Sequence, residues 1–102
     1  MKALILNFRR IKGKKDPNAE YVSFNMFDIE QKILYTEMFS SVGEINLPGG
    51  VLPTEQECKD TFPRMADVDF EIRQLSNNGR PSYRPTVNGI TSWKFVELRK
   101  LV

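Results

Sequence analysis

Basic side chains are concentrated near the start of the chain, where they could contact phosphate. Lys and Arg number 15 against 13 Asp and Glu, so the formal net charge is only +2. Five of the basic residues nevertheless fall close together, namely Arg9, Arg10, Lys12, Lys14 and Lys15. Cations on a loop can follow a nucleic-acid backbone without fixed geometry and release its counterions. A solvated loop without a ligand explains such a cluster about equally well. Only Gly13-Lys14-Lys15 of a P-loop is present, which argues against nucleotide binding.

Aromatic residues in two neighbouring segments are the second feature with chemical meaning. Tyr21 and Tyr35 lie where apolar and polar residues alternate, and a ring on the exposed face of such strands can stack on a base. We expect Phe27 and Phe39, in the same segments, to be buried, because they lack the hydroxyl group that favours a wet edge. The two tyrosines are therefore the predicted stacking residues.

A later polar segment combines two cations with an aromatic ring. Arg80, Tyr83 and Arg84 lie among Asn, Gly, Pro, Ser and Thr residues, so the ring has no obvious core to enter. An aromatic ring flanked by arginines supplies stacking and phosphate pairing together, which predicts a nucleic-acid clamp. An oligomer contact or a plain exposed loop explains the same residues equally well.

The residue types that most enzymes need are scarce. The chain has no histidine and one cysteine, Cys58, which excludes the commonest general base, an intrachain disulfide and a structural zinc site. Asp67, Asp69 and Glu71 alternate and would share one face of a strand, as in a magnesium nuclease. Residues two apart on a strand are separated by roughly 6.6 Å, too far for all three to hold one ion. We therefore predict no catalytic residue, no metal site and no cofactor.

The elements that would position these residues are mostly β-strands. Apolar patterns predict five strands, at positions 2–10, 21–29, 32–39, 67–73 and 90–102. Turn-forming residues predict a basic loop at 11–20 and a projecting wing or long loop at 76–89. A further short strand is expected at 44–47. Thr54 and Glu57 have the spacing of a capping box, which predicts a short helix that ends before Pro63.

The order of these elements predicts a single domain over residues 1–102. Five antiparallel strands, a short helix and a projecting loop between the last two strands are typical of an all-β barrel of the OB type. The apolar start of the chain is interrupted by Arg9 and Arg10 and is too short for a signal peptide or a membrane span. We accordingly expect a cytoplasmic protein with no membrane partner.

With the strands placed, the sequence resembles the single-stranded DNA-binding replication proteins of phages, both the filamentous-phage family and OB-fold relatives from siphophages. Tyr21 after a basic, polar loop carries part of the resemblance, together with the strand at 21–29. The ending from Ser92 to Val102 (SWKFVELRKLV) looks like the closing strand of that family. The connection at 40–63 is longer than in the filamentous-phage pattern, which leaves the dimer geometry open.

The resemblance implies an OB-like barrel that forms a homodimer in the host cytoplasm. Such proteins coat single strands cooperatively and largely without sequence preference, and they catalyse no reaction. Lys12, Lys14, Lys15 and Tyr21 match the positions where these proteins place basic and stacking contacts.

Three classes of function fit the residues, and the fold class alone does not choose among them. A binder of single-stranded DNA, with RNA as the alternative ligand, should have basic and aromatic side chains on one face. A protein–protein interaction module should have a dry apolar patch there, and a nuclease should have clustered carboxylates beside a basic groove. The sequence favours the first class.

Overall fold

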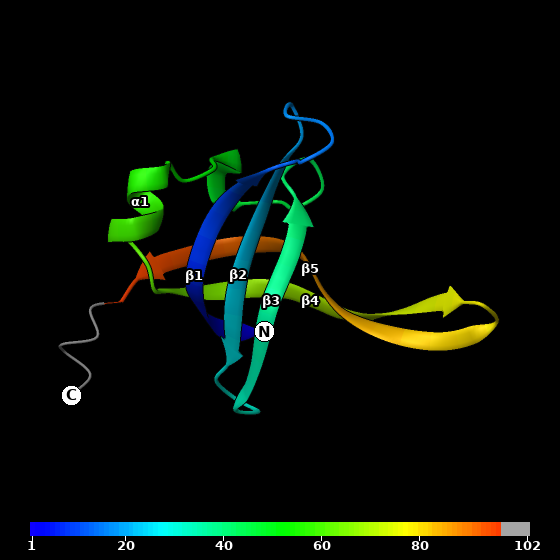
Figure 1. Ribbon diagram of the computed structural model, residues 1–102. Coiled ribbons are helices and arrows are strands. Elements are labelled where there is room, and N and C mark those ends of the chain that lie inside the picture. The colour runs from blue at the N-terminus through cyan, green and yellow to red at the C-terminus, as the bar shows by residue number, and fades with distance from the viewer. Residues whose placement is uncertain (97–102) are drawn as a thin grey trace.

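Five antiparallel strands form one sheet in the order β3-β2-β1-β4-β5, in a computed structural model that describes residues 1–96 (Figure 1). The sheet curves around its core, which confirms the predicted all-β, barrel-like class. Residues 97–102 of the last predicted strand lie outside the described residues. The elements are β1 (Lys2–Lys12), β2 (Glu20–Asp28), β3 (Ile33–Ser41), the 3-10 turn η1 (Pro48–Gly50), α1 (Glu55–Asp60), β4 (Arg64–Asn77) and β5 (Arg80–Phe95).

The segment after β3 joins the two ends of the sheet. Asn46 forms a parallel bridge with Gly89 of β5: its N–H donates to the Asn88 carbonyl at 3.1 Å, and its carbonyl accepts from the Ile90 N–H at 2.7 Å. A Cβ atom at Gly89 would lie only 3.1 Å from the Asn46 Cβ, so this close approach favours glycine. The strand predicted at 44–47 is thus reduced to one bridge, which places the turn after β3 beside the middle of β5.

The core contains a cluster of aromatic rings centred on Phe8. Phe8 stacks on Phe62 with 4.9 Å between ring centroids and on Phe24 at 5.8 Å, and Trp93 meets its ring edge-on at 5.6 Å. These contacts join β1, β2, β5 and the segment before β4. The largest fully buried side chains are Phe8, Phe24, Ile5, Met26, Ile90 and Val22.

A bulge in β1 decides which of its residues face this core. Between Leu6 and Arg9, β1 has one residue more than β2 opposite it. Asn7 accommodates the extra residue in the left-handed region, at a φ of 51°. Alternation from the buried Ile5 would otherwise place Arg9 inside, but the bulge turns Phe8 inward and Arg9 outward.

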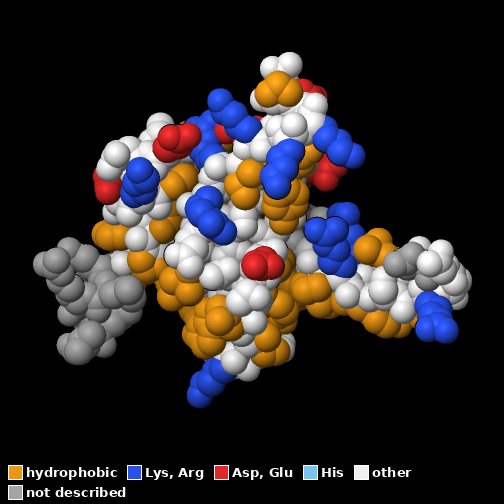
Figure 2. Space-filling view, in the orientation of Figure 1, with side chains coloured by type: hydrophobic (Ala, Val, Ile, Leu, Met, Phe, Trp, Pro, Cys, Tyr) orange, Lys and Arg blue, Asp and Glu red, His pale blue; other side chains and the backbone are white. Residues whose placement is uncertain are grey.

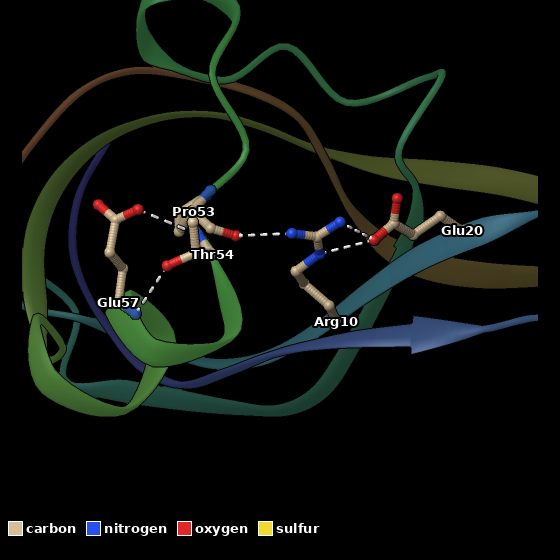
Figure 3. Close-up of polar contacts among 5 residues, drawn as sticks. All are labelled: Arg10, Glu20, Pro53, Thr54 and Glu57. Carbon is tan, nitrogen blue, oxygen red and sulfur yellow. Dashed lines mark hydrogen bonds and ion pairs between the residues drawn. The ribbon is translucent and has the colours of Figure 1, made fainter.

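The helix α1 begins with the predicted capping box. The Thr54 hydroxyl accepts the Glu57 N–H at 3.1 Å, and the Glu57 carboxylate accepts the Thr54 N–H at 3.1 Å (Figure 3). The helix ends at Asp60, before Pro63, which confirms this prediction. Burial raises the pKa of the Cys58 thiol on α1, which keeps it protonated at neutral pH. None of the helices within residues 1–96 has the length and apolar composition needed to cross a lipid bilayer.

The segment predicted at 76–89 as a projecting wing or long loop does project, but it is part of a long β-hairpin and not a loop. β4 continues to Asn77 and β5 begins at Arg80, with Asn78 and Gly79 in the turn at φ values of 53° and 76°. Asn-Gly favours such two-residue turns because both positions need a positive φ. Pro81 and Pro85 are tolerated because β5 is the last strand of the sheet. We call residues 71–86, which project from the body of the fold, the wing (Figure 1).

Candidate nucleic-acid interface

Arg9, Tyr21 and Phe39 lie on one outward face of the sheet. In β2, alternate residues point to opposite sides of the sheet, and Tyr21 and Ser23 share the side away from the core, although the small Ser23 is itself buried. The strand register places Arg9 and Phe39 on either side of Ser23, and Ile11 beside Tyr21. The resulting patch spans β1, β2 and β3. Figure 2 shows basic side chains around apolar ones on the upper part of this face.

The rings of Tyr21 and Phe39 stack on each other within this patch. Their centroids are 5.0 Å apart and their planes differ by 21°. Phe39 is 46% exposed and Tyr21 is half-buried. The pair borders a hollow of about 420 Å³, whose other walls are the turn after β3 and the base of the wing, including Arg84. An exposed ring beside a hollow of this size can stack on a base.

A second bulge exchanges the positions expected for Tyr35 and Phe39. Between Tyr35 and Met38, β3 has one residue more than β2 opposite it, and Glu37 takes a φ of 55° there. Tyr35 consequently faces the core and packs on Phe70 at 5.1 Å between centroids, while Phe39 faces outward. The prediction that Phe39 is buried is therefore wrong. The structure does not bring Tyr35, a predicted stacking residue, into the patch.

The basic loop between β1 and β2 lies next to Tyr21. A Cβ atom at Gly13 would lie 2.6 Å from the Asp16 carbonyl oxygen and 3.3 Å from the Tyr21 ring, so the tight loop requires glycine there. The exposed lysines of the basic cluster are Lys12, Lys14 and Lys15. They are therefore attached to the strand ends that carry the aromatic patch.

Arg10, although it belongs to the same cluster, is held in an internal network. Its Nε donates to the Glu20 carboxylate at 2.6 Å and Nη2 forms an ion pair with the same carboxylate oxygen. Its Nη1 donates to the Pro53 carbonyl at 3.3 Å (Figure 3). Arg10 thus connects β1 and β2 to the start of α1. This position favours a structural role over phosphate contact.

The wing has one basic and one apolar face. Its strands pair regularly from 71 to 86, so alternate residues point to opposite sides. Arg80 and Arg84 lie on the same side as Arg73. Tyr83 lies on the other side with Ile72, and these two are 67% and 52% exposed. The structure therefore separates Tyr83 from the two arginines with which the sequence predicted a clamp.

Arg73 and Arg84, opposite each other in the β4–β5 register, differ in their freedom to bind a ligand. Arg73 donates from Nε to Glu71 and from Nη2 to Asn88, both at 2.6 Å. Hydrogen bonds from Arg73 and Asn88 hold the pKa of Glu71 below its usual value, so the carboxylate that accepts from Arg73 is ionised at neutral pH. Arg84 forms no ion pair with any of residues 1–96. Arg84 is thus the cation of the hollow that is available to a phosphate.

The acidic row on β4 does not form a metal site. Within residues 1–96, no group of three His, Cys, Asp or Glu side chains is arranged to hold a metal ion. The Asp67 carboxylate accepts a hydrogen bond from the Ser92 hydroxyl at 2.9 Å, and Glu71 is occupied by Arg73. These two carboxylates therefore accept hydrogen bonds from neighbouring side chains of the same sheet.

A larger hollow of about 850 Å³ lies between β1 and α1. Arg9, Lys59 and Phe62 are among its lining residues. Arg9 therefore borders both this hollow and the aromatic patch.

Comparison with protein-family models, curated proteins and solved structures gives no match.

Proposed function

We propose that this protein binds single-stranded nucleic acid, with single-stranded DNA as the first ligand to test and RNA as the alternative. The observation that carries the proposal is the Tyr21–Phe39 stack, in which Phe39 is exposed, with cations on both sides that form no ion pair within residues 1–96. Arg9 and the loop lysines lie on one side and Arg84 on the other. Single-strand binders combine stacking platforms with basic grooves in this way. OB-type barrels bind oligonucleotides on the face of strands 2 and 3, between the same two connections.

The contacts available on this face predict limited sequence preference. Every base has an aromatic face that can stack on Tyr21 or Phe39, and phosphate contacts to lysine and arginine carry no sequence information. In a duplex the base faces are covered by their neighbours. Single strands should therefore bind better than duplexes of the same length.

We expect oligo-dT to bind more tightly than duplex DNA, with an affinity that falls as salt rises. Each neutralised phosphate should contribute about 0.7 to the slope of log affinity against log salt. A variant with Lys12, Lys14 and Lys15 replaced by alanine should flatten this slope while its unfolding midpoint stays unchanged, because the loop is exposed. Fluorescence anisotropy over a salt series measures both quantities. Equal affinity for both DNA forms would mean that the protein binds DNA by positive charge alone, without base stacking, and would contradict the proposal.

The apolar face of the wing favours self-association as a second property, in line with the expected homodimer. Tyr83 and Ile72 are exposed next to each other on neighbouring strands, together with Pro81 and Pro85 on the same face. Tyr83→Ala should lower the apparent mass in sedimentation, and any loss of oligo-dT affinity should shrink at high protein concentration, as mass action predicts. An affinity loss at unchanged mass would instead make Tyr83 a ligand contact.

A further inference from the structure

A carboxylate borders the hollow beside Tyr21 and Phe39. Glu44 lies in the turn after β3 and lines the hollow together with Ser40 and Ser41. Its side chain forms no ion pair with any of residues 1–96. An unpaired carboxylate repels a phosphate group, so the backbone of a bound strand is not expected next to Glu44. The part of a nucleotide that can approach it is the base.

The backbone of Glu44 is held by contacts of the residues on both sides of it. Its N–H and that of Ile45 donate to the Ser41 carbonyl at 3.0 Å and 3.1 Å. Ile45 is buried in the core, and Asn46 is bridged to β5. The backbone that carries the carboxylate is therefore held between the end of β3 and the middle of β5, and the exposed side chain of Glu44 extends from this fixed backbone.

The aromatic pair and Arg84 determine how a nucleotide would lie in the hollow. A base stacked on the exposed Phe39 ring lies against the wall formed by β3 and its turn, and Arg84 on the opposite wall can take the phosphate. The edge of that base then faces the turn that carries Glu44, Ser40 and Ser41. The volume of about 420 Å³ falls within the range of small-ligand sites.

We propose that this hollow is a subsite for a base with an exocyclic amino group, and that Glu44 selects it; the inference rests on the proposed function. A carboxylate accepts hydrogen bonds and donates none. Adenine, cytosine and guanine carry an amino group that can donate to it. Thymine and uracil carry a carbonyl oxygen where cytosine has its amino group, and two acceptors facing each other repel. Stacking and phosphate contacts bind every sequence, and the subsite adds a preference to this general affinity.

The test compares pyrimidine oligonucleotides that differ at this one position. Twelve-residue oligo-dC should bind about fivefold more tightly than oligo-dT, the lower end of what one good base contact provides. Oligo-dU should behave like oligo-dT, which excludes an effect of the thymine methyl group. Glu44→Gln should bring the dC to dT ratio close to one, because an amide can donate to thymine as well as accept from cytosine. Glu30→Gln, an exposed change in the β2–β3 turn, should keep the ratio of the unmodified protein.

The outcomes separate this inference from the function on which it rests. Equal binding of dC and dT by the unmodified protein would overturn the subsite and leave single-strand binding intact. A preference for dC that survives Glu44→Gln would overturn the role of Glu44. Absence of binding to all three oligonucleotides, by a protein whose unfolding curve is cooperative, would overturn the proposed function as well.

Discussion

Phe8→Ala should lower the free energy of unfolding by about 3 to 5 kcal/mol, the range for removing a fully buried phenylalanine. Phe8 is 1% exposed and touches the rings of Phe24, Phe62 and Trp93. Its removal would leave a cavity where β1, β2, β5 and the segment before β4 meet. A domain of this size has a total stability of roughly 5 to 15 kcal/mol, so the variant would be close to unfolded.

Urea unfolding followed by the fluorescence of Trp93, the only tryptophan, measures this loss. Val51→Ala serves as the control, because Val51 is 65% exposed and its truncation should change stability by less than about 0.5 kcal/mol. A similar loss in both variants would contradict the assignment of Phe8 as the centre of the core.

Period-two patterns predicted the fold class because most of the sheet obeys them. In β2, residues 22, 24 and 26 are buried without interruption, and the sequence shows this alternation directly. The capping box of α1 was predicted because Thr54 and Glu57 act locally, within one turn of the chain. Features that depend on only a few neighbouring residues could therefore be predicted from the sequence.

The bulges were not predicted, because nothing in the residues themselves requires an extra residue in a strand. Glu37 takes a positive φ that its type rarely adopts, and Asn7 takes one that asparagine tolerates but does not require. The pairing across the sheet imposes both values. Each bulge reverses the alternation after it. Tyr35 was chosen for the binding face and Phe39 for the core because of the tyrosine hydroxyl group, whereas the bulge between them decides which of the two faces outward.

The hairpin structure of the wing was not predicted, for a different reason. Its prolines, polar residues and Asn-Gly pair indicated a loop, although Asn-Gly between two extended segments is also the strongest local signal for a hairpin. Once the turn is placed at Asn78 and Gly79, the register separates Tyr83 from Arg80 and Arg84. That register also places Arg73 on the basic face, a position that the sequence alone did not indicate. The solvent exposure of the basic loop could be predicted, because its lysines and turn-forming residues favour contact with water whatever the rest of the fold is.

The aromatic pair should dominate binding, so its removal is the most direct test of the site. Tyr21→Ala and Phe39→Ala should each weaken oligo-dT binding by about 1 to 3 kcal/mol, the range for one base stacked on an aromatic ring. The double variant should lose less than the sum of the two, because the rings stack on each other and removing one already disturbs its partner.

Tyr21→Phe should keep most of the affinity, since it preserves the ring and removes only the hydroxyl group. Leu34→Ala is the matched control: Leu34 is on β3 and 53% exposed, but it lies at the far end of the strand from Phe39. Titration of labelled oligo-dT and urea unfolding on the same preparations separate lost contacts from lost folding. If the double variant folds with unchanged stability and binds oligo-dT as the unmodified protein does, then the patch is not the binding face. In that case the cations around Arg9 would have to bind nucleic acid through the hollow beside α1.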